Sequence, residues 1–209
     1  LLDFALDKVP DGWEATAGRW QFVGEQIEAA RQAVRTYAST GLLTEGNFEL
    51  EADVTMEPVS GKADESKLWE ASVLFNARDR ENYYAARVQR QAGKAYVALY
   101  KMIGGKQYTI TAPVPFPFPF EAETTYRLRI RLLDGVITVA VNDSEVIRAV
   151  DHFFSRGYVA LSNLNTDAQF DNIWLKREVP IAGPVTVDID ERIFNVTEVD
   201  TFQGEEMDI

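Results

Sequence analysis

Apolar and polar residues alternate with a period of two over much of the chain, and this pattern limits the fold more than any other feature. The clearest run covers residues 126–132, where four apolar side chains alternate with three arginines. A second run, over residues 48–54, alternates in the same way with carboxylates. Because successive side chains of a strand point to opposite faces, each run predicts a strand with one buried and one solvated face.

Further segments of strand character recur about every 8–12 residues, with turn residues between them. We expect strands at residues 20–23, 68–77, 83–90, 95–102, 107–112, 136–141, 146–150, 158–163 and 170–176. The pairs Asp134-Gly135 and Asn142-Asp143 are typical of two-residue hairpin turns. Many short strands joined by turns predict an all-β protein, either a β-sandwich or a jelly roll.

The segment 25–38 is ambiguous, because it is rich in residues that favour a helix. It lies between the strands expected at 20–23 and 48–54. We favour extended structure here, because the surrounding sandwich often overrides local propensity. A helix is the alternative.

Four prolines alternate with apolar residues over residues 113–120. Each proline lacks an amide donor, so this segment cannot be a central strand. We expect an extended loop or sheet edge, in which Phe116, Phe118 and Phe120 cover one end of the core. The alternative is an aromatic rim beside a binding groove, or a contact between chains.

Composition excludes several classes of function. With 209 residues, 46% of them hydrophobic, the chain can bury a core, and with no cysteine it has no disulfide or thiolate site. A single histidine, His152, excludes multi-histidine metal sites and disfavours a Ser-His-Asp triad. The net charge of −12 argues against nucleic acid and anionic membranes as partners. No apolar run approaches the roughly 20 residues of a membrane helix.

The negative charge is concentrated near the end of the chain. Residues 178–209 contain nine acidic residues and one basic residue, a net charge of −8, which leaves −4 for residues 1–177. We therefore expect two parts, a sandwich over 1–177 and an acidic extension over 178–209. Alternation after the linker-like start of the extension predicts one or two added strands. Residues 179–209 then contact their own domain or a neighbouring chain, as in a homo-oligomer.

A series of short motifs recurs in an order and spacing that resemble a known superfamily. They are Pro10-Asp11-Gly12-Trp13, Gly18-Arg19-Trp20, the run 48–54, Val73-Leu74-Phe75, Asn82-Tyr83-Tyr84, Tyr126-Arg127-Leu128, Gly157-Tyr158-Val159-Ala160-Leu161 and Phe170-Asp171-Asn172-Ile173. Together they resemble the concanavalin A-like lectin/glucanase superfamily. The resemblance is nearest to laminin-G-like domains, levan-type carbohydrate-binding modules and keto-glycoside hydrolase-like domains.

The resemblance implies a jelly roll of two stacked antiparallel sheets, with glycans bound on a concave face or at its rim. It also implies an extracytoplasmic location, which removal of a signal peptide before Leu1 would fit, although a fragment boundary fits equally well. A structural calcium is common among such modules. By resemblance its best anchor is Asp171, which Asp3 could join; no other cofactor is expected.

Glu49, Glu51 and Asp53 lie two residues apart and therefore share one face of a strand. Retaining glycosidases need two carboxyl groups about 5–5.5 Å apart, which same-face neighbours can approach. Related glucanases place their catalytic pair on one strand, but the order of acids here matches that pattern imperfectly. We expect a solvated face whose carboxylates pair with Arg127, Arg129 and Arg131, and hydrolysis is the alternative.

The connection over residues 76–84 concentrates groups that recognise sugars. Planar polar side chains can make paired hydrogen bonds to neighbouring hydroxyls, and aromatic faces suit the apolar side of a sugar ring. The candidates are Arg78, Asp79, Asn82 and Tyr84. Alternation requires that one of Tyr83 and Tyr84 faces the core. A turn held by surface ion pairs is the alternative.

The two following strands offer a second set of candidates. Arg87 and Gln89 share one face, and Tyr96 and Tyr100 share the face opposite the expected core residues of the next strand. If these strands form the concave sheet, the four side chains line a groove. Trp69 follows a charged stretch, and we expect it to be exposed, whereas Trp20 is expected in the core and Trp174 on a solvent face.

These observations favour a carbohydrate-binding module without catalytic activity. A glycoside hydrolase or keto-glycoside hydrolase-like enzyme, using Glu49, Glu51 or Asp53, is the first alternative. An assembly domain that joins chains through its acidic extension is the second.

Overall fold

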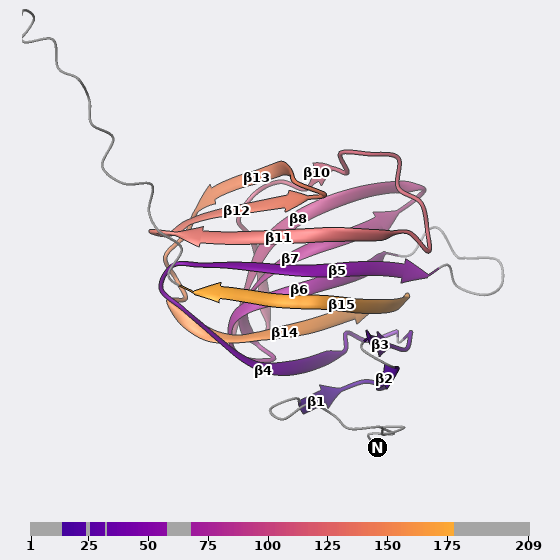
Figure 1. Cartoon of the computed structure of the whole chain (residues 1–209), viewed down its shortest axis with the longest axis horizontal. Coiled ribbons are helices and arrows are strands. Elements are labelled where there is room, and N and C mark those ends of the chain that lie inside the picture. The colour runs from indigo at the N-terminus through magenta and orange to yellow at the C-terminus, as the bar shows by residue number, and fades with distance from the viewer. Residues whose placement is uncertain (1–13, 24–25, 32, 58–67, 178–209) are drawn as a thin grey trace, which may run out of the picture. The chain divides into compact units, whose positions relative to one another are not determined.

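The computed structural model describes residues 14–23, 26–31, 33–57 and 68–177. All regular structure in these residues is β-strand, arranged as two antiparallel sheets that face each other (Figure 1). The all-β sandwich predicted from the alternation is therefore confirmed. No helix in the described ranges is long and apolar enough to span a membrane.

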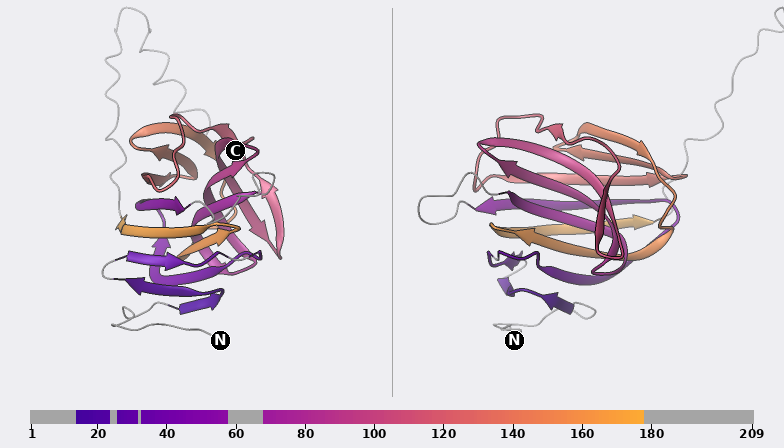
Figure 2. Two further views of the ribbon diagram at one scale, coloured as in Figure 1. Left: turned by 90° about the vertical axis from the view of Figure 1, so that its right-hand side faces the viewer. Right: turned by 180° about the vertical axis from the view of Figure 1, so that it is seen from behind.

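One sheet, here called sheet A, has eight strands and faces the viewer in the right-hand view of Figure 2. In spatial order they are β1 (Glu14–Ala17), β4 (Tyr37–Glu45), β14 (Arg156–Leu164), β6 (Trp69–Asp79), β7 (Asn82–Gln91), β8 (Lys94–Ile103) and β10 (Val114–Pro115), with β9 (Lys106–Thr109) also paired to β8.

Sheet B has seven strands and faces the viewer in Figure 1. In spatial order they are β13 (Ser144–Val150), β12 (Val136–Val141), β11 (Thr125–Leu133), β5 (Phe48–Glu57), β15 (Asp167–Arg177), β3 (Gln26–Ala29) and β2 (Trp20–Val23).

Both predicted hairpin turns are present. Asp134, Gly135, Asn142 and Asp143 all have positive φ, as the type of turn that matches strand twist requires.

The core lies between the sheets and is built by alternate residues of their strands. On β5, Phe48, Leu50 and Val54 are buried and point toward sheet A. The ring of Phe48 meets the ring of Phe75 on β6 at 6.0 Å, edge to face. Burial of each such side chain stabilises the fold by about 1.5–3 kcal/mol.

The ambiguous segment contains two stretches of strand joined by an irregular connection with a bend, and no helix among its described residues. Gln26–Ala29 forms β3, which pairs with both β2 and β15, and β4 begins at Tyr37. The preference for strand over helix is therefore confirmed, because pairing with two neighbours outweighs helix propensity. Most of β4 has no counterpart among the predicted strands.

The proline-rich segment forms an edge, as expected. Its residues Val114 and Pro115 pair with the outer side of β8. Phe116 is 9% exposed and lies edge to face against Tyr126 at 4.8 Å, whereas Phe118 is 39% exposed. Phe120 stacks on Tyr126 at 5.4 Å. Phe116 and Phe120 thus cover the core end, and Phe118 does so only in part.

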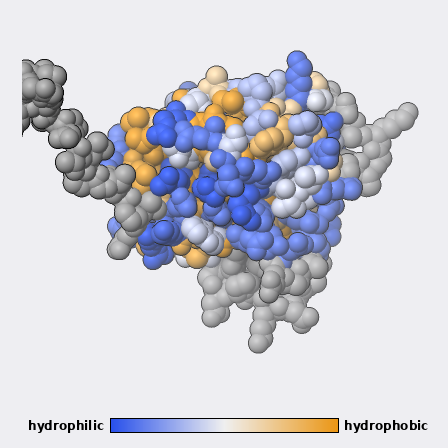
Figure 3. All heavy atoms as spheres, turned by 45° about the horizontal axis from the view of Figure 1, so that its top comes forward, coloured by the Kyte–Doolittle hydropathy of each residue, from blue (hydrophilic) through white to orange (hydrophobic). Residues whose placement is uncertain are grey.

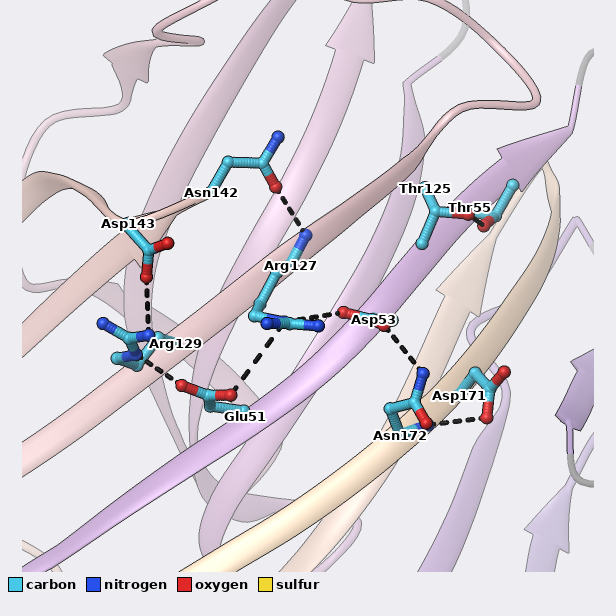
Figure 4. A network of polar contacts seen from close by, with 10 residues as sticks. All are labelled: Glu51, Asp53, Thr55, Thr125, Arg127, Arg129, Asn142, Asp143, Asp171 and Asn172. Carbon is cyan, nitrogen blue, oxygen red and sulfur yellow. Dashed lines mark hydrogen bonds and ion pairs between the residues drawn. The ribbon is translucent and has the colours of Figure 1, made fainter.

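The outer face of sheet B presents an Arg–carboxylate ladder between β5 and β11. Its rungs are Arg127–Asp53, Arg129–Glu51 and Arg131–Glu49, with nitrogen–oxygen distances of 3.1, 2.5 and 2.8 Å. Figure 4 shows the first two rungs, and hydrophilic side chains gather over the middle of the face in Figure 3. The predicted pairing of the arginines is confirmed, because antiparallel register places each one opposite a carboxylate.

Contacts divide the chain into two units, residues 1–179 and 180–209, and all described residues belong to the first. The expected boundary near 177, the strands of the extension and its contact with another chain lie outside the described residues.

Candidate functional site

The outer face of sheet A, away from the core, carries the second set of sugar-binding candidates. Arg87 and Gln89 on β7 and Tyr96 and Tyr100 on β8 all alternate with core residues, so they share this face. Arg87 and Tyr100 are buried, and Gln89 and Tyr96 are partly exposed. The prediction that the four share one face is therefore correct, although the centre of that face is covered.

A charged cluster occupies this centre, and we call it the Glu70 cluster. Glu70 is fully buried, and its Oε2 lies 2.8 Å from Arg35 and 2.9 Å from Arg87. Its Oε1 accepts a hydrogen bond from Ser72 at 3.0 Å. The guanidinium of Arg87 lies 4.0 Å from the centre of the Tyr100 ring. Charges this deeply buried are tolerated only when they are paired, as here.

The cluster shifts the titration of its neighbours. Burial and the nearby Glu70 carboxylate raise the pKa of Tyr100 to about 12. Burial opposes the charge on Arg35, but Tyr100 and Glu70 together hold its pKa above the ordinary value. At neutral pH the tyrosine hydroxyl therefore keeps its proton and the arginine its charge.

A row of tyrosines leads from the cluster toward the end of the sheet. The rings of Tyr100 and Tyr83 are 6.2 Å apart, and those of Tyr83 and Tyr37 are 5.9 Å apart, all edge to face. The hydroxyls of Tyr37 and Tyr83 are hydrogen-bonded at 3.0 Å. Burial raises the pKa of Tyr83 far above its usual value, so the Tyr83 hydroxyl keeps its proton at neutral pH.

Beyond Tyr37 the face is hollowed into a pocket of about 570 Å³, which we call the outer pocket. Its walls come from β1, β4, β6, β14 and the turn after β6. The lining residues are Glu14, Tyr37, Ser39, Gly41, Ala77, Arg78, Asp79, Arg80, Tyr158 and Ala160. It combines two tyrosines, two arginines and two carboxylates.

Irregular strand pairing accounts for the hollow. The register of β14 against both β4 and β6 shifts between Tyr158 and Ala160, so each neighbour carries extra residues at that point. Gly41 and Asn76 in these stretches adopt positive φ. Extra residues bend a strand and re-aim its side chains, which opens the sheet surface here.

The first set of candidates divides between the pocket and the turn beside it. Arg78 and Asp79 line the outer pocket, and their binding role stays a prediction. Asn82 does not: its amide donates to Asp79 Oδ1 at 2.9 Å, and its Oδ1 accepts from Gly104 N at 3.0 Å. Asn82 therefore holds the turn that carries Asp79.

Two predicted binding residues face the core instead. Trp69 was expected to be exposed, but it is 3% exposed. Its side chain points to the same face of β6 as those of Val73 and Phe75, which lie in the core. Tyr84 also faces inward and is fully buried. Alternation correctly required one of the two tyrosines to face the core, but the outward one is Tyr83.

Sequence reasoning missed Glu70, Arg35, Tyr37 and Tyr158. Tyr158 is 47% exposed and follows from the alternation of residues 157–161, which puts its neighbour Val159 in the core. Arg35 and Tyr37 belong to the ambiguous segment, where helix and strand periodicities gave no single face.

Glu49, Glu51 and Asp53, the alternative catalytic set, share one face as predicted. That face is the outer side of sheet B, whereas the outer pocket lies on the outer side of sheet A. Each carboxylate is engaged by an arginine of the ladder.

The expected calcium anchor makes ordinary hydrogen bonds. Asp171 Oδ1 accepts from Asn172 N at 2.7 Å, and Oδ2 accepts from Gln26 at 3.3 Å. In the described part of the chain, no three histidine or acidic side chains are grouped so as to hold a metal ion. Asp3 lies outside the described residues, and a calcium site stays a prediction.

Two further hollows are present. One, of about 420 Å³, lies at the end of sheet B beside Glu28, Glu57 and Asp167. Burial and the nearby Asp167 raise the pKa of Glu57 above its usual value. The other, of about 370 Å³, lies among loops at the opposite end of β5.

Comparison with known proteins gives one family match. The model described as a 3-keto-alpha-glucoside-1,2-lyase-like domain matches residues 6–176. A search of the curated proteins found no match.

Solved structures resemble this chain in fold. The carbohydrate-binding module CBM66 from Bacillus subtilis is 23% identical, with a TM-score of 0.68 over 79% of this chain and 95% of that one. The exoplasmic/lumenal domain of VIP36 in its Ca²⁺/Man-bound form is 13% identical, with a TM-score of 0.60 over 82% and 85%. A protein of unknown function with a galectin-like fold from Bacillus subtilis is 11% identical, with a TM-score of 0.58 over 78% of this chain and 88% of that one. The resemblance to the concanavalin A-like superfamily is thus confirmed at the level of fold.

Proposed function

The chain belongs to the family of 3-keto-alpha-glucoside-1,2-lyase-like domains, and on that premise we propose that it binds a carbohydrate in the outer pocket of sheet A without cleaving it. The observation on which this rests is the pocket itself, about 570 Å³ in volume. Pockets for small ligands are of this size and combine apolar surface with a few polar groups that fix orientation.

The side chains of the pocket suit a sugar ring. The exposed ring of Tyr158 and the wall formed by Tyr37 offer aromatic surface to the C–H side of a sugar. Arg78 and Arg80 offer donors for paired hydrogen bonds to neighbouring hydroxyls. Asp79 offers an acceptor whose position is fixed by the turn.

The fold is consistent with this proposal. A carbohydrate-binding module and a domain named in a Ca²⁺/Man-bound form share it. The VIP36 domain is named as exoplasmic/lumenal, and we extend the proposal to an extracytoplasmic location for this chain.

Glycan-array screening followed by isothermal titration calorimetry tests the proposal. We expect Tyr158→Ala and Arg78→Ala each to weaken binding about tenfold or more, which corresponds to about 1.4 kcal/mol. Trp174→Ala is the matched control, because Trp174 is a similarly exposed aromatic residue on β15 of sheet B. An absence of binding to every neutral and acidic glycan contradicts the proposal.

An enzymatic role is the second candidate, and the family description favours it. A 1,2-lyase acting on a 3-keto-α-glucoside removes the proton at C2, forms a C1=C2 double bond and breaks the C1–O bond, and the leaving oxygen takes up a proton. The reaction therefore requires a general base. Asp79 is the pocket carboxylate held in place by its turn, and Glu51 belongs to the alternative set on sheet B.

Release of the leaving group from a 3-keto-α-glucoside, followed by NMR, distinguishes these assignments. Loss of turnover in Asp79→Asn places the base in the outer pocket. An unchanged rate in Glu51→Gln excludes the carboxylates of sheet B. If the wild type shows no turnover while it binds glycans, the binding function stands alone.

A further inference from the structure

A second pocket, which we call the distal pocket, lies among loops at the end of the sandwich where β11 and β13 terminate (left in Figure 1). It has a volume of about 370 Å³. Three connections form it: the turn before β5, the turn after β11 and the loop before β14. The lining residues are Gly46, Asn47, Leu132, Asp134, Gly135, Asp151, His152, Phe154 and Ser155.

The two turns of the distal pocket are tied together by hydrogen bonds. Asp134 N donates to Asn47 Oδ1 at 2.9 Å, and Asn47 Nδ2 donates to Asp134 Oδ1 at 3.4 Å. Asp151 N donates to Gly135 O at 2.9 Å, which joins the third connection to the second. The polar wall of the pocket is therefore held in one arrangement before any ligand arrives.

The only histidine of the chain, His152, has a fixed place in this wall. Its ring lies over Gly135, so closely that a Cβ at this glycine would fall 1.8 Å from the ring. Gly135 also has φ +76, a conformation that other residues rarely adopt. The glycine thus makes both the turn and the position of the imidazole possible.

Asp151 anchors the loop that carries His152 and Phe154. Its carboxylate accepts hydrogen bonds from Phe153 N at 3.0 Å, from Lys101 Nζ at 2.5 Å and from the hydroxyl of Tyr84. Lys101 and Tyr84 both belong to sheet A, so the loop is fixed to the sheet that carries the outer pocket.

The outer and distal pockets are neighbours. Arg78 lines the outer pocket, and its guanidinium lies 5.3 Å from the ring of Phe154, which lines the distal pocket. Asn76 Nδ2 donates to Phe154 O at 2.7 Å and fixes this contact. Phe153, 52% exposed, adds aromatic surface beside Phe154.

We propose that the distal pocket is a second subsite for the same carbohydrate chain, so that the ligand is an oligosaccharide rather than a single sugar. This inference rests on the proposed function of the outer pocket. Asn47, Asp134 and Ser155 supply donors and acceptors for hydroxyls, as the polar side chains of the outer pocket do. The exposed aromatic surface at this end comes from Phe153, because Phe154 is buried. One sugar unit lies in each pocket, and the part of the oligosaccharide between them passes Arg78.

Calorimetry with sugars of increasing length tests this inference. The probes are methyl α-glucoside, maltose, maltotriose and maltopentaose, with the corresponding fructose and mannose series. We expect affinity to rise about tenfold or more from the single sugar to the longest member of the series that binds. His152→Ala and Ser155→Trp, which fills the distal pocket, are expected to remove this increase and to leave binding of the single sugar within about twofold.

Arg148→Ala is the control, because Arg148 is exposed on β13 and pairs with Glu145 on the same strand. It is expected to change neither affinity. Equal affinity for single sugars and long chains overturns the second subsite, as does an increase that survives both distal-pocket variants. Absence of binding by all three series contradicts the proposed function itself, and this outcome is distinct from binding that is independent of length.

Discussion

Glu70 is a residue whose role depends wholly on what surrounds it. Alternation on β6 places it opposite the core residues Trp69 and Ala71, on a face that is solvated in many sandwiches. Here Arg35 and Arg87 enclose it, and it has no exposed surface. One carboxylate therefore compensates the buried guanidinium of Arg87 and the partly exposed guanidinium of Arg35.

Substitution of Glu70 by Gln is expected to lower the free energy of unfolding by about 3–5 kcal/mol, because it leaves the buried Arg87 and the partly exposed Arg35 without a counter-charge. Urea denaturation measures the change. Glu145→Gln is the control, because Glu145 and its partner Arg148 are both exposed and are expected to contribute little. Equal effects of the two variants would show that the Glu70 cluster is not stabilised by its ion pairs.

For single residues, the sequence predicted which face of a strand a side chain occupies better than it predicted how deeply that side chain is buried. The alternation placed Arg87 and Tyr100 on one face, and that is where they lie. The two adjacent tyrosines do not by themselves show which one faces the core, but the position of Arg87 on the same strand places Tyr83 on the outer face and Tyr84 in the core. Trp69 was misplaced because the preceding charged residues suggested exposure, whereas the strand already begins at Trp69 with an inward side chain.

Among the structural elements, the proline-rich segment shows that alternate side chains can differ widely in burial. Phe116 follows the two paired residues of β10 and is buried against Tyr126, whereas Phe118 is 39% exposed. Both follow a proline, so local sequence does not separate them.

We expect Phe116→Ala to destabilise the protein by about 3–5 kcal/mol, because it removes a buried ring and leaves a cavity. Phe118→Ala is expected to cost less than about 1 kcal/mol, as substitutions at exposed positions usually do. Thermal and urea unfolding of the pair measure the difference. Similar costs for both variants would contradict the assignment of Phe116, rather than Phe118, to the core end.

Strand pairing explains why some strands were predicted from the sequence and others were missed. β5 and β11 were evident because a half-buried strand shows alternation directly, and their ladder followed from charge complementarity. Most of β4 was missed because its pairing with β14 is interrupted by a register shift, which breaks the alternation. The same irregularity shapes the outer pocket, so the site lies where the sequence pattern is weakest.

For the whole molecule, both pockets are completed by residues that precede the acidic extension. The last lining residue of the outer pocket is Ala160, and that of the distal pocket is Ser155. β15, which ends at Arg177, is already paired on both sides by β3 and β5.

Removal of residues 180–209 is therefore expected to shift the melting temperature by no more than about 2–4 °C, the change that about 1 kcal/mol produces in a chain of this size. Glycan affinity and the number of chains per particle in solution are expected to stay unchanged. Calorimetry and light scattering measure them. A fall in the number of chains per particle would instead favour the assembly role, in which this segment joins neighbouring chains.

Alternation by itself determined that the chain forms half-buried strands, and therefore that two antiparallel sheets enclose a core, because side chains of period two leave no other way to bury one face. Only the tertiary structure decided where the outer pocket lies. The outer pocket joins β1, β4, β6 and β14, and its hollow comes from extra residues opposite Val159. Such a site depends on register between strands distant in sequence, and register is set by packing of the whole sandwich rather than by any one segment.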